Sequence, residues 1–431
     1  MFISPRSFFV FAALAVFSRA AIPNLDREIV FAPHAGAARE DAEIVRWQQA
    51  IRPDQAGRAG ASVAGAEAFE RLGWAYIAKA RRTLDAGYYG LAERTAGVMV
   101  AEFGATPGAN FLRGHALHNL HRFAEAEEIA RGLTASRGLP VDFALLSDVL
   151  VEQGEVAEAI VALQRFAELR PGAEASSRIS HVRWVRGDVN GAVAAMEDAL
   201  RASSPREPEN QAWLFVRLAM LRLQTGDHAA ALALADTVIG RLSDYAPALL
   251  MHGKALLALG KKAEAILALR MAAELNPLPE YQWWLADSFR SGGREDEARS
   301  VEAQIVSRGA AADPRTLALF LATRGEDTAQ AVRLARAELV QRADIFSQDA
   351  LAWALFANGE LAAAEVAMRA ALAEGTRDAR LSLHAGEIAR AAGRTEEARG
   401  HFARALEGAG TLLPAERSRL GAGSVRVAAV E

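Results

Sequence analysis

The sequence contains no cysteine. This absence excludes disulfide bonds, thiol catalysis, zinc–thiolate sites and a lipid-modified N-terminal cysteine. Lysine is scarce as well, so arginine supplies almost all of the 49 basic side chains. A net charge of −4 leaves no basic excess of the kind that nucleic-acid binding needs. We therefore expect a chain that is stabilised by packing alone and that has no nucleic-acid partner.

Aromatic residues and catalytic motifs are also rare. Aromatics make up 7% of the chain, and the 51% hydrophobic share is carried by alanine and leucine, the strongest helix formers. The sequence lacks a GxxxxGK[ST] loop, an HExxH motif and a GxSxG elbow; residues 60–64, GASVA, lack its last glycine. We therefore predict an all-α protein without catalytic activity, metal or cofactor.

One apolar run stands out, at the N-terminus. Arg6 precedes ten apolar residues, Phe8 to Phe17, and small residues follow at Ser18 and Ala20. Ten helical residues span about 15 Å, half of a bilayer core of roughly 30 Å. The pattern predicts a cleaved signal peptide over residues 1–20, no stable membrane insertion and a periplasmic or secreted protein. An uncleaved anchor is the alternative.

Residues 21–65 are expected to form an N-terminal extension. Pro23 and Pro33 predict that residues 21–38 are extended or irregular. A single short helix is expected over Arg39 to Ile51, before a Gly/Ala-rich connector.

A self-similar unit of about 34 residues then repeats. Its clearest example, residues 249–277, has two apolar helical segments around a break at Gly260. An alanine of the second helix recurs at spacings of 33 or 34 with one of 39, as Ala92, Ala126, Ala159, Ala192, Ala231, Ala265, Ala298, Ala331, Ala364 and Ala398. A glycine five residues earlier predicts the turn in most units, at Gly87, Gly154, Gly187, Gly226, Gly260, Gly293, Gly359 and Gly393. His121 takes this place in the second unit, and Gly325 comes one residue early in the eighth.

The unit resembles the tetratricopeptide repeat, a helix–turn–helix of 34 residues with small residues in both helices. The matching residues are Leu72, Gly73, Tyr76, Gly114, Phe123, Pro171, Gly253, Ala265 and Pro277. Arg183 and Arg222 depart from it at a position that is usually bulky and apolar. The resemblance covers residues 66–408 and implies a right-handed superhelical solenoid of about ten hairpins. Trp47-Gln48 and residues 72–93, LGWAYIAKARRTLDAGYYGLAE, are also similar to exported bacterial members of this superfamily.

Two segments interrupt or end the repeats. The 39-residue spacing coincides with residues 203–210, SSPREPEN, which are expected to form a longer loop between repeats. This loop is either a bend in the solenoid or a plain surface insertion. Residues 409–431 are expected to cap the solenoid with a short helix near Pro414 to Leu420.

Five tryptophans share one side of the first helices. Counted at 100° per residue back from each turn, they fall within an arc of about 80°, separate from the hairpin core. They are Trp74, Trp184, Trp213, Trp283 and Trp353. In tetratricopeptide superhelices this flank lines the concave groove, so the rings are candidates for binding a peptide. The alternative is that they pack against the next repeat.

Two histidines lie on the same arc, and two arginines are further polar candidates. His115 and His118 share a helix face with the tryptophan positions, but His121 lies about 240° round the helix from His115, which disfavours a three-histidine metal site. Arg183 and Arg217 are candidates for ordering polar contacts with a partner. Together these patterns predict a scaffold that binds a peptide or protein in its groove, in the cell envelope. A self-associating structural component, or an accessory subunit of an envelope enzyme or secretion assembly, is the alternative.

Overall fold

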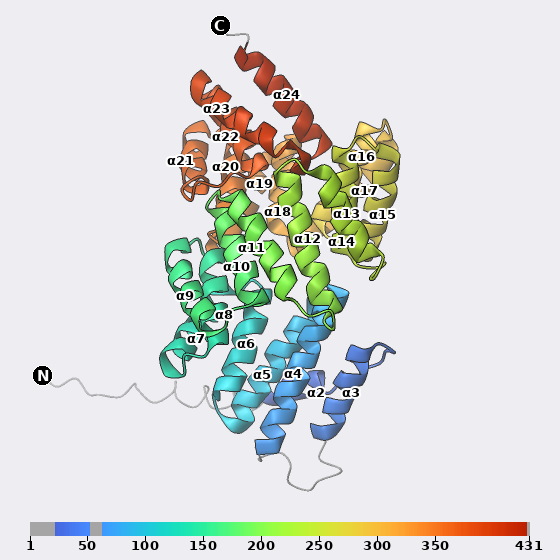
Figure 1. Ribbon diagram of the computed structural model, residues 1–431, viewed down its shortest axis with the longest axis vertical. Helices are drawn as coiled ribbons and strands as arrows, with labels where there is room; N and C mark the ends of the chain where they lie inside the picture. The colour runs from blue at the N-terminus through green and yellow to red at the C-terminus, as the bar shows by residue number, and fades with distance from the viewer. Residues whose placement is uncertain (1–21, 52–62, 429–431) are drawn as a thin grey trace, which may run out of the picture. The chain divides into compact units, whose positions relative to one another are not determined.

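The computed structural model describes residues 22–51 and 63–428, and within them all regular structure is helical (Figure 1). The chain divides into two compact units, unit 1 up to Val149 and unit 2 from Leu150. The predicted signal peptide lies outside the described residues. No described helix is long and apolar enough to span a bilayer.

The helices follow one another as antiparallel pairs, as the repeat predicts. Unit 1 contains α4 (Val63–Thr83) with α5 (Gly87–Phe103) and α6 (Pro107–Asn119) with α7 (Phe123–Ser136), and α8 (Pro140–Glu152) crosses into unit 2. Unit 2 continues with α9 (Val156–Leu169), α10 (Ala173–Val185), α11 (Val189–Ala202), α12 (Pro208–Gln224), α13 (His228–Ile239), α14 (Ala246–Ala258), α15 (Lys262–Leu275), α16 (Pro279–Ser291), α17 (Glu295–Ala312), α18 (Pro314–Arg324), α19 (Thr328–Gln341), α20 (Ile345–Ala357), α21 (Leu361–Ala371), α22 (Ala379–Ala391) and α23 (Thr395–Glu407). The predicted solenoid of helical hairpins is confirmed.

Small residues hold each hairpin together. The ten alanines that define the repeat are all fully buried. In the first helix of the sixth repeat, a Cβ on Gly253 would lie 2.5 Å from Leu269, so only glycine allows the two backbones to approach so closely.

The turns between paired helices use a left-handed residue. Gly154, Gly187, Gly226, Gly260, Gly293, Gly359 and Gly393 have φ between +75° and +83°, and Gly325 has φ +68°. His121 adopts φ +58° at the equivalent position. In the first repeat the prediction that Gly87 forms the turn was wrong. Leu84 is left-handed there (φ +59°), while Gly87 opens α5.

The described part of the N-terminal extension, residues 22–51, contains two helices, whereas one was expected. α3 spans Arg39–Ile51 as predicted, but α2 covers Ile22–Val30, where an irregular segment was expected. Pro23 is compatible with this helix because it lies in the first turn, where its missing N–H has no helical acceptor. Gln48 of α3 donates to the Val30 carbonyl (2.9 Å) and to the Tyr76 hydroxyl of α4 (3.0 Å), which joins both helices to the first repeat.

Both interruptions are more helical than predicted. Residues 208–210 form the first turn of α12, which has 17 residues, so the longer spacing lengthens a helix as well as a loop. The bend remains a prediction. At the C-terminus a short 3₁₀ helix, η3 (Ala409–Thr411), leads into α24 (Pro414–Ala428), which extends beyond the predicted helix.

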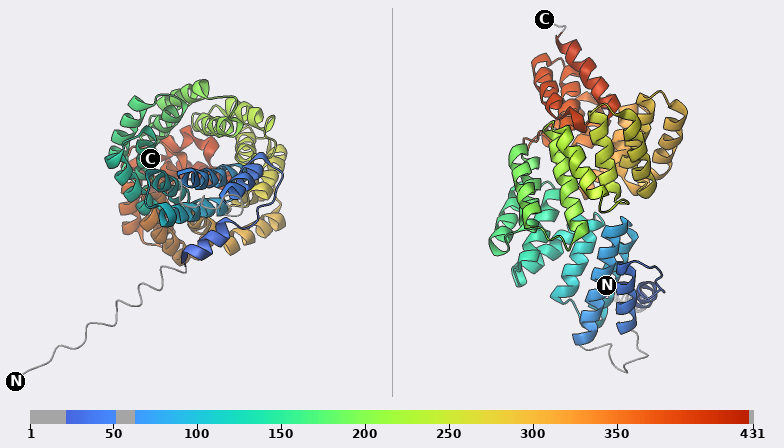
Figure 2. Two further views of the ribbon diagram at one scale, coloured as in Figure 1. Left: turned by 90° about the horizontal axis from the view of Figure 1, so that it is seen from below. Right: turned by 45° about the vertical axis from the view of Figure 1, so that its right-hand side comes forward.

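The superhelix of unit 2 closes on itself. Seen from below, its helices follow one another around a circle (Figure 2). A Cβ on Gly154 would lie 2.6 Å from the carbonyl oxygen of Ala343, and one on Gly187 would lie 2.2 Å from that of Gly375. Gln224 donates to Asp378 (3.0 Å) in the next part of the same seam. Turns of early repeats therefore pack directly on backbone of late ones.

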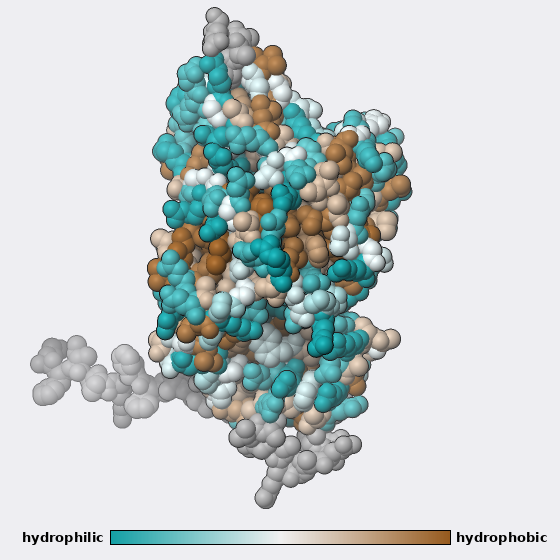
Figure 3. Space-filling view, viewed as in Figure 1, coloured by the Kyte–Doolittle hydropathy of each residue, from teal (hydrophilic) through white to brown (hydrophobic). Residues whose placement is uncertain are grey.

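The surface of unit 2 mixes polar and apolar side chains. On the face in Figure 3, hydrophobic residues lie in separate areas among hydrophilic ones. Among the exposed apolar side chains are Leu267, Met271 and Leu275 of α15.

Candidate functional site

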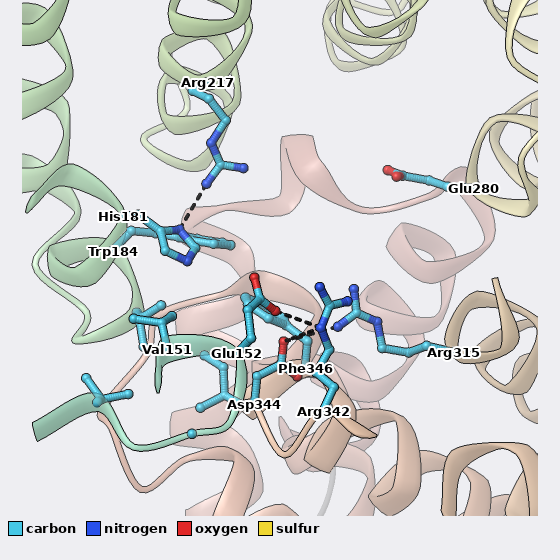
Figure 4. Close-up of a pocket in the computed structure, with 14 residues that line it drawn as sticks. Val151, Glu152, His181, Trp184, Arg217, Glu280, Arg315, Arg342, Asp344 and Phe346 are labelled. Carbon is cyan, nitrogen blue, oxygen red and sulfur yellow. Dashed lines mark hydrogen bonds and ion pairs between the residues drawn. The ribbon is translucent and has the colours of Figure 1, made fainter. Parts of the chain in front are cut away.

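The closure of unit 2 creates a cavity of about 320 Å³ between early and late repeats (Figure 4). It is lined by Val151, Glu152, Gly154, Val156, His181, Trp184, Val185, Arg217, Glu280, Arg315, Arg342, Asp344, Ile345 and Phe346. These residues come from helices and connecting loops on both sides of the superhelical seam, so the cavity exists only in the closed arrangement.

One wall of the cavity is aromatic. Trp184 of α10 stacks on Phe346 of α20, with ring centroids 5.2 Å apart and an interplanar angle of 24°. The Trp184 side chain is almost fully buried, at 6% exposure. This pair ties an early repeat to a late one and gives the cavity a rigid apolar surface.

The floor of the cavity is a balanced charge network. Arg342 pairs with Glu152 (2.6 Å), and Arg315 pairs with Asp344 (3.2 Å). Asp344 lies 3.9 Å from Arg342 and also caps α20 by accepting from the Ser347 N–H (2.7 Å). Two arginines therefore face two carboxylates, and the floor has no formal excess charge.

Arg217 of α12 differs, because it forms no ion pair with any described residue. A guanidinium nitrogen lies 3.1 Å from Nδ1 of His181, as Figure 4 shows. The guanidinium also lies 5.6 Å from the ring centroid of Trp184 and 5.9 Å from that of Trp213. Burial lowers the pKa of Arg217, but an arginine stays charged in proteins. The cavity therefore carries one cation that no carboxylate contacts directly, although the charge of Glu152 partly opposes the lowering of the Arg217 pKa.

Glu280 lies across the cavity from Arg217 (Figure 4). Its carboxylate pairs with Lys254 of α14 at 2.7 Å, and this neighbour lowers the pKa of Glu280. About half of the Glu280 side chain remains exposed. The charge of Glu280 is thus already compensated, which leaves Arg217 as the group that can receive a further ligand.

The structure brings some predicted site residues together. Trp184, Trp213 and Arg217 form one cluster, and Trp213 is 42% exposed. In unit 1, Trp74 is half-buried against His115, with ring centroids 5.3 Å apart.

Other predicted site residues lie elsewhere. His118 packs edge-on against Phe123 (5.5 Å), next to its own turn. Arg183 donates to the Gly191 carbonyl (3.2 Å) and approaches Asp188 (3.9 Å), so it orders the turn of its own repeat instead of reaching the cavity.

Two of the five predicted rings do not line an open groove. Trp283 is 5% exposed and packs edge-on against Phe320 of the next repeat (5.7 Å). Trp353 is 1% exposed beneath His384. The predicted direction of each ring took into account only the two helices of its own repeat. In the structure the first helix of the following repeat covers the ring. These two rings therefore pack between repeats.

Sequence reasoning missed several lining residues. His181, Glu280 and Arg315 occupy the same distances before their turn glycine as Trp353, Trp213 and Trp283 do. A search for polar residues at the helical positions of the tryptophans would have found these three residues. Arg342 and Asp344 lie in a connecting loop and have no such signal.

The chain was compared with known proteins and with family models. No curated protein matches the chain. Among solved structures, a monomeric mutant of IFIT1 with Gppp-AAAA has a TM-score of 0.50 at 12% identity, with 89% of this chain and 94% of that chain covered. The human IFIT1 dimer with PPP-AAAA has a TM-score of 0.47 at 12% identity and covers 90% and 94%. A tetratricopeptide repeat protein from Parabacteroides merdae has a TM-score of 0.34 at 17% identity and covers 59% and 98%.

The family model of the tetratricopeptide repeat matches residues 144–205, 177–247, 250–314 and 350–412. These matches cover more than half of the chain and follow the helix pairs of the structure. The chain belongs to the tetratricopeptide repeat family.

Proposed function

We propose that this protein is a non-catalytic scaffold that binds an extended segment of a partner protein at the cavity of unit 2. The observation that carries the proposal is Arg217, a cation without a carboxylate partner between the rings of Trp184 and Trp213. Burying an unpaired charge costs free energy, and a ligand carboxylate would offset this cost. The segment would place one acidic group on Arg217 and an apolar neighbour on Trp213.

A peptide fits the cavity charges better than a nucleic acid does. A phosphate backbone needs many cations in a row, whereas two of the three cavity arginines already face Glu152 and Asp344. A single carboxylate needs only Arg217.

We also propose that the scaffold acts in the periplasm or another part of the cell envelope. The support is the charged, apolar and small-residue sequence of residues 1–20. Intact-mass measurement on protein purified from expressing bacterial cells tests this, with a chain that begins near Ala21 as the expected result. A full-length cytoplasmic chain would contradict export.

Selection of random displayed peptides on the full chain tests the binding function. We expect selected peptides to lose at least tenfold in affinity, by titration calorimetry, when Arg217→Gln or Trp213→Ala is introduced. Arg299→Gln is the matched control, since Arg299 is an exposed arginine outside the cavity. Peptides that bind equally well to all variants would place the site elsewhere. Tight binding of single-stranded RNA that depends on Arg217 would favour a nucleic-acid ligand instead.

A further inference from the structure

The C-terminal segment, residues 408–420, makes two kinds of contact. The first kind is apolar and joins the segment to the last repeat. Leu412 and Leu420 are buried with Leu383 of α22 and Phe402 of α23. These contacts cover the end of the solenoid, and a cap needs no more than this.

The second kind of contact is polar and reaches earlier repeats. The Ala415 N–H donates to Asp287 of α16 (2.8 Å). Arg417 donates to the Leu257 carbonyl of α14 (3.2 Å), and Arg419 donates to the Thr323 carbonyl of α18 (3.3 Å). The partners are 96 to 160 residues earlier in the chain, so the segment lies across three first helices at once.

The two carbonyls share a property that favours cations. Leu257 is one residue before the end of α14, and Thr323 is one residue before the end of α18. The last carbonyls of a helix lie at the negative end of its dipole. The Leu257 carbonyl also accepts from the Gly260 N–H (3.2 Å), and its second lone pair is left for a cation. The surface formed by α14, α16 and α18 therefore presents two cation sites and the Asp287 carboxylate.

The arginines that fill these sites serve no ion pair. Neither Arg417 nor Arg419 pairs with a carboxylate among the described side chains, and burial lowers the pKa of Arg417. Arg419 also lies 5.2 Å from the ring centroid of Trp353. Glu416, which is buried, pairs with Arg380 (2.7 Å) and fixes the direction of the segment. These polar contacts go beyond what is needed to cover the end of the solenoid.

We propose that the surface formed by α14, α16 and α18 is a docking site for a basic helical segment, and that residues 408–420 occupy it as an exchangeable intramolecular ligand. A partner segment with two arginines two positions apart, like Arg417 and Arg419, takes the same place once the chain's own segment leaves. This site is separate from the cavity around Arg217 and does not depend on the function proposed for it.

Opening of the segment can be measured by thiol labelling, because the full chain has no cysteine of its own. Leu413→Cys reports on the segment, and Leu256→Cys in α14 is the matched control, since both side chains are almost fully buried. We expect Leu413→Cys to label at least tenfold faster than Leu256→Cys under native conditions. Equal labelling would mean that the segment opens only with the whole fold, which overturns the proposal.

Exchange is tested with a fluorescent peptide that has the sequence of residues 408–428. The tethered segment has an effective concentration in the millimolar range, so the unaltered chain should bind little peptide. The full chain with Arg417→Gln and Arg419→Gln should bind it at least tenfold more tightly, by fluorescence anisotropy. A peptide with the same two substitutions should not bind. Failure of the native peptide to bind the folded double variant contradicts the proposal. If the double variant does not fold, the Leu413→Cys labelling decides alone.

Discussion

The imidazole ring of His384 lies flat against the indole ring of Trp353, with centroids 4.0 Å apart and an interplanar angle of 7°. The other edge of His384 is held by Asp349, whose carboxylate oxygens lie 2.9 and 3.1 Å from Nδ1. The Trp353 N–H donates to the Thr323 hydroxyl (3.0 Å). One ring thus joins the first helices of three successive repeats.

Replacing Trp353 with alanine should therefore reduce stability rather than partner binding. Removal of a buried tryptophan costs about 3–5 kcal/mol, since it loses apolar burial and leaves a void. Urea denaturation followed by circular dichroism measures the change. Trp213→Ala is the control and should shift the free energy of unfolding by less than about 1 kcal/mol, because Trp213 is 42% exposed. Similar losses in both variants would contradict the difference in burial.

The contact between superhelical turns can be isolated with two glycines of nearly equal conformation. Gly187 and Gly260 have φ of +77° and +78°, so alanine costs about 1–2 kcal/mol of backbone strain at either. Only at Gly187 does the added Cβ collide with a backbone atom, the carbonyl oxygen of Gly375. We expect Gly187→Ala to lower the melting temperature clearly more than Gly260→Ala does. Equal shifts would show that this seam is open in solution.

Because of Asp287, the free energy of unfolding of the protein should fall as the pH rises. Burial raises its pKa to about 6, opposed by the Ala415 N–H and modified by Glu416, Arg290 and Glu302. The folded chain therefore holds this proton more tightly than the unfolded chain, whose aspartate has a pKa near 3.9. The stabilisation is complete below pH 4 and is lost as the pH rises through 6, at a cost of roughly 3 kcal/mol.

Asp287→Asn checks this pH dependence, because the amide oxygen can still accept from Ala415 without carrying charge. Urea unfolding at several pH values should show the variant to be the more stable chain at pH 7.5. Its advantage should shrink toward pH 4. A constant difference between the two chains at all pH values would mean that Asp287 titrates normally.

Leu84 offers a stabilising change in unit 1. Its backbone is left-handed (φ +59°), which strains a leucine, and the residue is 36% exposed. Leu84→Gly should raise the free energy of unfolding by about 0.5–1 kcal/mol, since relief of strain exceeds the added chain entropy. Leu84→Ala keeps the strain and should give no gain. Thermal unfolding of both variants measures the difference.

The repeat period was enough to predict the hairpins, because it depends on contacts within one unit. The buried alanines and the left-handed glycines lie where the spacing places them. The first turn was mispredicted because Leu84 takes a conformation that usually requires glycine.

The cavity could be predicted only in part. Helical phase brought Trp184 and Trp213 to one side, but it did not include Arg217 and could not show which rings a later repeat covers. The approach of Gly187 to Gly375 depends on small rotations that add up over successive repeats. A sequence pattern within one repeat does not show the total rotation over many repeats. For this reason the sequence could not show that Arg342 and Asp344 lie near Arg217.

The closed seam of unit 2 also changes how this solenoid should unfold. An open repeat array has only nearest-neighbour contacts, so its ends can fray one repeat at a time. Here Gly187 and Gly375 touch across 188 positions, and loss of the last repeats also uncovers early ones. Such distant contacts raise the contact order, which slows folding and couples the repeats into one cooperative transition.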